Sequence, residues 1–263
     1  MKVVITDLDG TLLDHDTYSW EAARPALERL RQYDIPLIFS TSKTRVEVEE
    51  WRATLENRHP FIVENGGALY IPQGYFRRPH PFTRKIDGYE VFEFGEPYHF
   101  LVEALVGAAA ESACSVEAFS DLSPEQIAQR AAMPVRQASL AKQREYDEVF
   151  AILGGDGREL LAAIERRGKR WTRGGRFYHI TGRNHKGLAA FLLLRLFDDI
   201  YHELTSIGLG DSANDIDLLR AVDFPVIVRS PESGRLLQEV PNARATTLTG
   251  PEGWNSAILE MIP

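Results

Sequence analysis

Residues 3–11 read VVITDLDGT, and this stretch decides the fold of the 263-residue chain. The β-branched residues that end at Thr6 predict a short buried strand, and the loop after it carries Asp7 and Asp9 two positions apart. In open α/β sheets, ligands bind in the crevice beyond the carboxyl ends of the strands. We therefore expect both carboxylates to face a binding crevice, although Asp is also an ordinary residue of turns and caps.

A second strand and acidic loop lie near the C-terminus. Residues 205–209 predict a strand, and residues 208–215, GLGDSAND, place Asp211 and Asp215 in the loop after it. Four carboxylates at two strand ends indicate a hard divalent cation, and Mg²⁺ prefers such oxygen ligands. Considered alone, the pair Asp211 and Asp215 is equally compatible with a simple helix cap.

Strands alternate with helices at both ends of the chain, which predicts an α/β protein with a doubly wound, Rossmann-like parallel sheet. The alternation changes between about residues 81 and 179, where a strand, two helices, a strand and a helix follow one another. We interpret this region as an inserted α+β domain. The predicted division is therefore a core of residues 1–80 and 180–263, with the insertion at residues 81–179.

Composition narrows the function classes and the compartment. The chain has 38 acidic and 30 basic residues and a net charge of −8, so we expect no nucleic-acid and no membrane partner. Its only cysteine, Cys114, excludes an intramolecular disulfide and a Cys-based zinc site, which favours a cytoplasmic location. Apolar runs stay well below the roughly 18 residues of a membrane span, and the early Asp7 predicts no signal peptide. The oligomeric state is not predictable from these features.

Two further segments suit the binding of phosphate. Lys186 opens an apolar helix, so its ammonium and the free N–H groups of the helix terminus could face an anion. Thr41, Ser42 and Lys43 follow a predicted strand and offer hydroxyl groups and a cation. By themselves, a lysine in a first turn is usually exposed, and a Ser/Thr run is an ordinary helix cap. His179 ends another predicted strand and is a candidate for the cleft.

In chain order, residues 7–11, Thr41, Lys186 and residues 210–215 resemble the four signature motifs of the haloacid dehalogenase superfamily. An insertion after the second motif and before the lysine, together with the run at residues 65–67, looks like the subclass with a large α+β cap of the Cof type. Ser42-Lys43-Thr44, the two glycines after Asn65, and residues 144–148 are similar to mannosyl-3-phosphoglycerate phosphatases.

This resemblance implies a mechanism. Asp7 would be the nucleophile and form an aspartyl-phosphate, and Asp9 would act as the general acid and then the general base. Thr41 and Lys186 would bind the phosphoryl oxygens. Mg²⁺ would be the cofactor, and the implied metal-binding residues are Asp7, Asp9 through its backbone carbonyl, Asp211 and Asp215.

The resemblance also implies a substrate, mannosyl-3-phosphoglycerate, which would give mannosylglycerate, a compatible solute. The candidate substrate-binding residues are Ser42, Lys43, Asn65, Gly66, Arg144 and Asn214. Among these, Lys43 and Arg144 are the cations that could read the substrate carboxylate, although a lone Arg144 is also typical of a solvated or ion-paired surface. A phosphatase for sucrose phosphate or a hexose phosphate, and a non-catalytic sensor of phosphorylated metabolites, stay open as alternatives.

Overall fold

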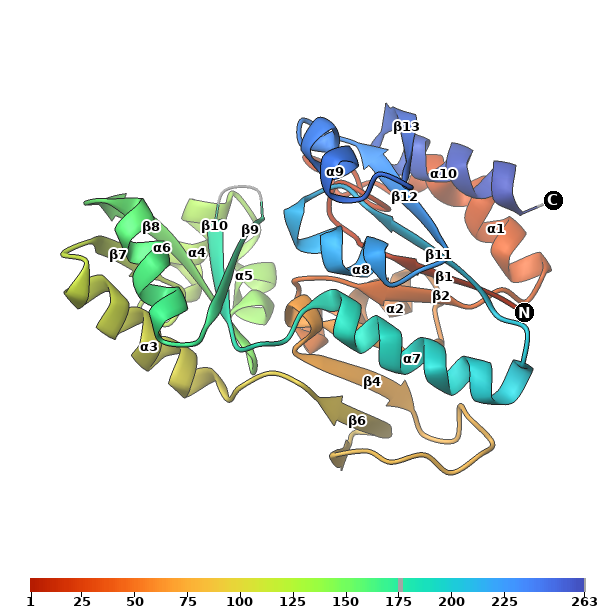
Figure 1. Cartoon of the computed structure of the whole chain (residues 1–263), viewed down its shortest axis with the longest axis horizontal. Coiled ribbons are helices and arrows are strands. Elements are labelled where there is room, and N and C mark those ends of the chain that lie inside the picture. Colours follow the sequence, from red (N-terminus) through yellow and green to blue (C-terminus); the bar gives the residue numbers. More distant parts are fainter. Residues whose placement is uncertain (175–176, 263) are drawn as a thin grey trace.

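The computed structural model describes residues 1–174 and 177–262, and its strands form two separate sheets (Figure 1). The larger sheet contains β1 (Lys2–Thr6), β2 (Leu37–Ser40), β3 (Phe61–Val63), β4 (Ala68–Pro72), β5 (Arg84–Ile86), β6 (Tyr89–Glu93), β11 (Thr205–Gly210), β12 (Phe224–Arg229) and β13 (Arg244–Thr249). The smaller sheet contains β7 (Ser115–Ala118), β8 (Asp147–Gly154), β9 (Arg170–Gly174) and β10 (Phe177–Thr181). The helices are α1 (Arg24–Gln32), α2 (Arg45–Thr54), α3 (Tyr98–Glu111), α4 (Pro124–Ala131), α5 (Val135–Ala141), α6 (Gly157–Arg166), α7 (Lys186–Tyr201), α8 (Ile216–Arg220), α9 (Ser233–Glu239) and α10 (Gly250–Met261).

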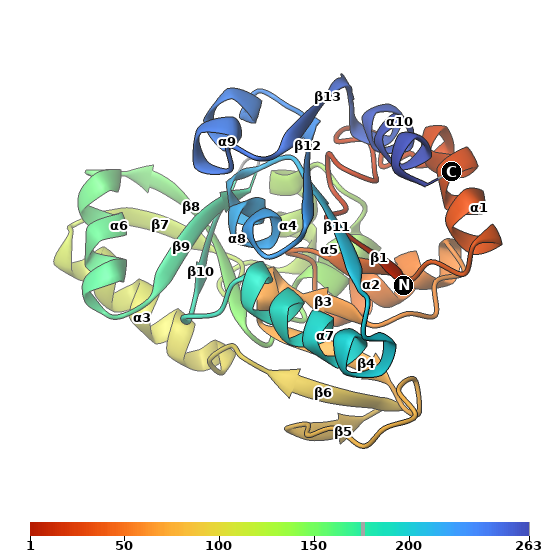
Figure 2. The ribbon, with the colours of Figure 1, turned by 45° about the vertical axis from the view of Figure 1, so that its right-hand side comes forward.

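The larger sheet has the strand order β13-β12-β11-β1-β2-β3-β4-β6-β5. The strands from β13 to β3 are parallel, and β4, β6 and β5 continue the sheet in antiparallel pairing. The predicted α/β class is therefore confirmed, and the sheet is mixed instead of wholly parallel. Strand β1 lies between β11 and β2 (Figure 1), so the loops after these three strands meet at one edge, and Figure 2 shows β1 beside β11 from another side.

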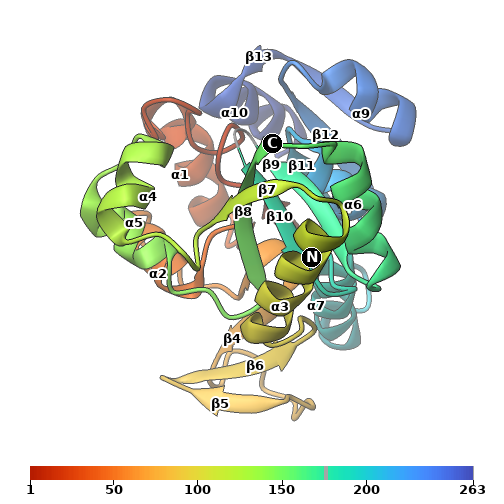
Figure 3. The ribbon, with the colours of Figure 1, turned by 90° about the vertical axis from the view of Figure 1, so that its left-hand side faces the viewer.

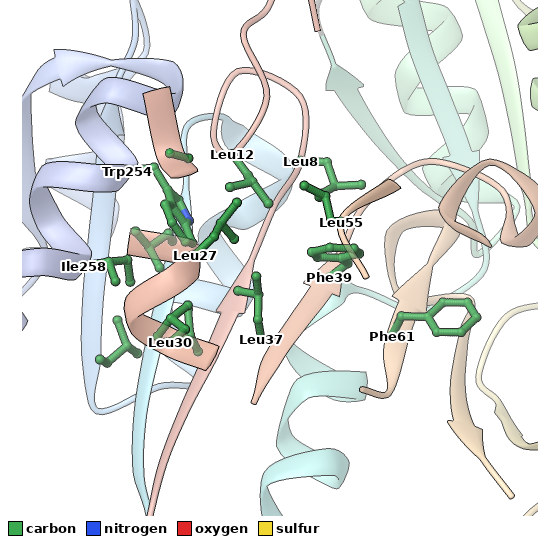
Figure 4. Packing of buried hydrophobic residues seen from close by; sticks show 14 of the residues in the cluster. Leu8, Leu12, Leu27, Leu30, Leu37, Phe39, Leu55, Phe61, Trp254 and Ile258 are labelled. Atoms are coloured by element: carbon green, nitrogen blue, oxygen red, sulfur yellow. The ribbon is translucent and has the colours of Figure 1, made fainter. Parts of the chain in front are cut away.

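Helices cover both faces of the larger sheet. Side chains alternate along β1, so that Val4 packs with α1 and α10 whereas Val3 and Ile5 pack against α7. Figure 4 shows part of the first cluster, in which Trp254 of α10 is fully buried. Each fully buried large apolar side chain of this kind contributes about 1.5–3 kcal/mol to stability. The central strand that carries the acidic loop is thus held rigidly from both sides.

The smaller sheet has the order β7-β8-β10-β9 and is entirely antiparallel. Helices α3 and α6 pack on one face in a separate hydrophobic cluster around Phe150. Helices α4 and α5 pack with Val149 of β8, and α5 also contacts α2 of the larger unit (Figure 3). No helix among the described residues is long and apolar enough to cross a membrane.

One predicted boundary is wrong in detail. The sequence assigns a strand near residues 89–94 to the insertion, but this strand, β6, pairs with β4 at the edge of the larger sheet. Its side chains explain the placement, because Val91 packs into the core cluster on one face and Phe92 into the cluster on the other. We propose that the inserted cap begins after β6 and comprises about residues 98–181.

Candidate active site

Three carboxylates meet where β1 and β11 end side by side. Asp7, Asp211 and Asp215 each place a carboxylate oxygen within 4.8 Å of the others. The turn that brings them together needs a glycine at position 10, because its φ is +75° and a Cβ there would lie 2.6 Å from Asp211 Oδ2. Thr11 then donates a hydrogen bond of 3.0 Å to Asp211 Oδ1. The two predicted acidic loops therefore form one cluster.

Lys186, the first residue of α7, supplies the positive charge inside this cluster. Its Nζ lies 2.6 Å from Asp7 Oδ1 and 2.6 Å from Asp215 Oδ1, and the side chain is completely buried. Burial raises the pKa of Asp7 to about 7, although the charge of Lys186 acts in the opposite direction. Burial also disfavours the charged ammonium, but Asp215 and Asp7 outweigh it and raise the pKa of Lys186 above its ordinary value.

The donor set of this cluster fits a divalent cation. One ammonium faces three carboxylates, and burial, followed by the charges of Asp215 and Asp7, raises the pKa of Asp211 well above its ordinary value. Asp7 Oδ2 and Asp211 Oδ2 have no hydrogen-bond partner within residues 1–174 and 177–262. Asp215 instead uses both oxygens, since Lys186 binds Oδ1 and the N–H groups of Asp211 and Ser212 bind Oδ2 at 3.0 and 3.1 Å. The unpartnered Oδ2 of Asp211 and the carboxylate of Asp7 are oxygen ligands of the kind that Mg²⁺ prefers.

Asp9 points away from this cluster and towards Lys43. Its Oδ2 lies 2.8 Å from Lys43 Nζ, and the ammonium of Lys43 also lies 5.0 Å from the centre of the Tyr18 ring. Burial disfavours the charge on Lys43, but Asp9 and Glu47 outweigh this effect and raise its pKa above the ordinary value. A contribution of the Asp9 side chain to the carboxylate cluster is not supported by this geometry, which leaves its backbone carbonyl.

The segment after β2 presents both hydroxyl groups and a helix cap. Thr41 is buried, and its Oγ1 accepts a hydrogen bond of 3.3 Å from the N–H of Lys43. Thr44, and not Thr41, caps α2, in a reciprocal arrangement with Glu47. The ordinary-cap interpretation of this run therefore holds for Thr44, whereas Thr41 lies directly after β2 and does not cap the helix.

A cavity of about 190 Å³ separates this edge of the larger sheet from the smaller sheet. Its walls come from both units. The core contributes Asp7, Asp9, His15, Tyr18, Ser42, Lys43, Glu47, Asp211, Ser212 and Asn214, and the cap contributes Phe119, Ala131, Met133, Ala141, Arg144, Val149, Gly174, Phe177 and His179.

Two of the predicted substrate-binding residues do not line this cavity. Asn65 has a left-handed backbone (φ 55°), and its side-chain amide donates to Asp147 Oδ2 at 2.7 Å and accepts from Asn214 Nδ2 at 3.0 Å. Gly66 has a φ of +83°, and a Cβ there would lie 2.3 Å from the carbonyl oxygen of His185. Both residues therefore position the chain around the cavity instead of forming its wall.

Arg144 lines the cavity but is bound to the protein. Its two terminal nitrogens each donate to the carbonyl oxygen of Ser42 at 3.1 Å, and one of them lies 3.6 Å from Asp147 Oδ1. The side chain is 4% exposed, so the interpretation as a solvated surface residue is wrong. Arg144 joins the cap to the loop after β2.

The comparisons with known proteins agree with this geometry. Residues 4–110 match the family of haloacid dehalogenase-like hydrolases. A glucosyl-3-phosphoglycerate/mannosyl-3-phosphoglycerate phosphatase from Methanococcoides burtonii is 41% identical to this chain, covering 99% of it and 97% of the relative. The chain belongs to the haloacid dehalogenase-like hydrolases.

Two further similar proteins match nearly the whole length of the hydrolase. A protein of the same name from Persephonella marina is 36% identical over 99% of this chain and 97% of its own length. The crystal structure of the sucrose-phosphatase from Synechocystis shares the fold, with a TM-score of 0.64 at 16% identity over 98% of this chain and 96% of that one. The hydrolase is a phosphatase with the core-and-cap architecture of this group.

A buried polar group at the start of β8 of this hydrolase is not among the site residues predicted from the sequence. Asp147 is fully buried, and both of its carboxylate oxygens lie 2.9–3.0 Å from Nδ1 of His179. Glu64, also buried, accepts hydrogen bonds from the N–H groups of Glu145 and Tyr146 at 2.7–3.1 Å. The sequence does contain a signal, because Asp147 and Glu148 begin an apolar strand. Acidic side chains in a buried strand require hydrogen-bond or ionic partners.

Proposed function

We propose that this phosphatase hydrolyses mannosyl-3-phosphoglycerate to mannosylglycerate and phosphate. The observation that carries the proposal is the uncommitted Oδ2 of Asp7, which shares one cleft with Asp9, Lys43 and the wall of the cap. Hydrolysis of a phosphate ester that carries a second anionic group requires a nucleophilic carboxylate, an acid/base carboxylate and a cation. The names of the relatives from M. burtonii and P. marina support the same substrate and include its glucosyl counterpart.

The reaction proceeds in two displacements. Asp7 Oδ2 attacks phosphorus, the bond to the glycerate oxygen breaks, and Asp9 gives its proton to that leaving oxygen. Asp9 then takes a proton from water as the water attacks the phosphorus of the aspartyl-phosphate, which releases phosphate and restores Asp7. Lys186 holds the other oxygen of Asp7 throughout, so the nucleophile keeps one orientation in both steps.

The phosphoryl oxygens need positive charge and hydrogen-bond donors around them. Thr41 and Lys186 would supply these groups from the ends of β2 and the start of α7. Asp7, Asp211 and the backbone carbonyl of Asp9 would hold Mg²⁺, with Asp215 orienting the loop. When bound, Mg²⁺ supplies charge that offsets the repulsion between the carboxylate nucleophile and the phosphate.

Recognition of the glycerate carboxylate falls to Lys43. This ammonium lines the cleft beside Asp9, whereas the guanidinium of Arg144 is already held by Ser42 and Asp147. The substitution Lys43→Met keeps the apolar length of the side chain and removes its charge. We expect kcat/KM for mannosyl-3-phosphoglycerate to fall ten- to a hundredfold more than kcat/KM for an aryl phosphate without a carboxylate, since about 1.4 kcal/mol is tenfold. Arg144→Ala should lower both alike, because it loosens the cap.

A screen of phosphate release at fixed Mg²⁺ tests the proposed function. The substrates are mannosyl- and glucosyl-3-phosphoglycerate, sucrose 6-phosphate, a hexose 6-phosphate and an aryl phosphate, with Asp7→Asn as the inactive control. The proposal requires the highest kcat/KM for a glycosyl-3-phosphoglycerate. A higher value for sucrose 6-phosphate or the hexose phosphate would favour a general sugar phosphatase, and binding without any phosphate release would favour a sensor.

A further inference from the structure

The cap wall of the cleft is mostly apolar, and two charged or ionisable side chains interrupt it among the residues that the structure describes. Phe119, Met133 and Phe177 form the apolar part. The two polar interruptions are Arg144, whose terminal nitrogens are occupied, and His179. A ligand whose phosphate lies at Asp7 must place its far end against this wall.

His179 has one ring nitrogen bound and one unbound. Its Nδ1 lies 2.9 and 3.0 Å from the two oxygens of Asp147, which is fully buried. Its Nε2 has no hydrogen-bond partner in the described ranges of the chain, although the side chain is only 7% exposed. This nitrogen belongs to a residue of the cavity wall, so a ligand bound in the cavity can supply its hydrogen-bond partner.

The neighbouring strand leaves this nitrogen open to the cleft. Gly174 of β9 pairs with Phe177, two positions before His179, and a Cβ at Gly174 would be 3.6 Å from Nε2, so a larger side chain there would cover the ring. Both Gly174 and His179 belong to the cavity wall. The missing side chain at position 174 therefore gives a ligand direct access to Nε2.

The ionised state of Asp147 decides how the ring of His179 is held. Burial disfavours the ionised carboxylate, but the charges of His179 and Arg144 and the hydrogen bond from Asn65 outweigh it and keep the pKa of Asp147 below its ordinary value. An ionised Asp147 accepts the hydrogen bond from Nδ1 and fixes the orientation of the ring, which leaves Nε2 facing the cleft. A hydroxyl group both donates and accepts hydrogen bonds, so a sugar hydroxyl suits this nitrogen in an otherwise apolar wall, and the phosphate and the carboxylate have their own places at the acidic cluster and at Lys43.

We propose that His179 binds the glycosyl part of the substrate through a hydrogen bond between its Nε2 and a sugar hydroxyl group. Asp147 acts through His179 and is a positioning residue. This inference rests on the proposed function for the identity of the sugar-bearing substrate. In this proposal the acidic cluster binds the phosphate, Lys43 binds the carboxylate and the cap binds the sugar.

Two substitutions separate the two nitrogens. His179→Asn places an amide near the position of Nδ1, so it can still pair with Asp147 but has nothing at Nε2. His179→Gln reaches the position of Nε2 with an amide that can hydrogen-bond to the hydroxyl group. His99→Asn, at an exposed histidine of α3, is the matched control. Thermal unfolding of each variant reports whether the fold is kept.

The measured quantity is the ratio of kcat/KM for mannosyl-3-phosphoglycerate to kcat/KM for an aryl phosphate, which has no sugar. We expect His179→Asn to lower this ratio ten- to a hundredfold, His179→Gln to lower it less, and the control to leave it unchanged. An unchanged ratio in His179→Asn overturns the proposal, as does an equal drop for the Asn and Gln variants. If the wild type does not hydrolyse mannosyl-3-phosphoglycerate, the proposed function fails instead, and the ratio for whichever sugar phosphate it hydrolyses decides on His179.

Discussion

Lys186→Met removes the one positive charge between Asp7 and Asp215 while keeping the apolar volume of the side chain. Both N–O distances are 2.6 Å and all three side chains are at most 7% exposed, so solvent cannot replace the lost charge. Removing one partner from a buried ion pair costs about 3–5 kcal/mol. We therefore expect the free energy of unfolding at pH 8, in EDTA, to fall by that amount.

The loss should depend on pH in a defined direction. Burial raises the pKa of Asp7 to about 7 even with Lys186 present, and without the lysine this pKa lies higher. A carboxyl group whose pKa is higher in the folded state than in the unfolded state favours folding only while it is protonated, so its contribution is lost as the pH rises through the folded pKa. The variant should therefore lose less stability at pH 5 than at pH 8.

Urea unfolding followed by tryptophan fluorescence, to which the buried Trp254 contributes, measures both values. Lys85→Met is the control, because Lys85 is half exposed and pairs with Glu90 at 3.1 Å on the surface, an arrangement worth less than about 1 kcal/mol. A loss at pH 8 no larger than that of the control, or the same loss at pH 5 and pH 8, would refute the view that Lys186 neutralises the acidic cluster.

Four further outcomes are expected from phosphate-release assays. Asp7→Asn should abolish turnover and keep the fold, since an amide cannot form the acyl phosphate; an unchanged kcat would exclude Asp7 as nucleophile. Asp9→Asn should lower kcat at least a hundredfold with little change in the Mg²⁺ requirement, and a full rate at saturating Mg²⁺ would contradict its acid/base role. EDTA should remove activity and Mg²⁺ restore it, whereas equal rescue by Ca²⁺ would argue against this coordination. Asp211→Ala should raise the half-saturating Mg²⁺ concentration at least tenfold, and an unchanged value would exclude it as a ligand.

The parallel part of the fold was predictable because its signals are local. One β-branched run ends at Asp7, and a second strand ends before Asp211. Each marks the carboxyl end of a strand, and parallel pairing brings these ends to one edge of the sheet. The place of β6 was not predictable in this way. Its residues Val91 and Phe92 would suit any half-buried sheet, and only the folded chain decides that β4 is the neighbour.

The candidate site was likewise predictable only where its signals are local. The positions of the acidic cluster and of Lys186 follow from motif order, whereas the partners of Asn65 and Arg144 depend on how the smaller sheet docks on the larger one. Asp147 and His179 are 32 positions apart and meet only because β8 and β10 pair. The sequence indicates that Asp147 needs a partner when its strand is buried, but no local pattern indicates that the partner is His179.

The side-chain amide of Asn65 joins the cap to the catalytic loop, with Asp147 on one side and Asn214 on the other. If binding of the sugar and binding of the cation both order this amide, the two events are coupled, and the free energy of coupling is the same in both directions. If a sugar held against the cap tightens the cation at Asp211 by some factor, the cation must tighten the sugar by the same factor. Substrate affinity measured without the metal would then understate the affinity in the working enzyme, and Asn65→Ala would bring the two values together.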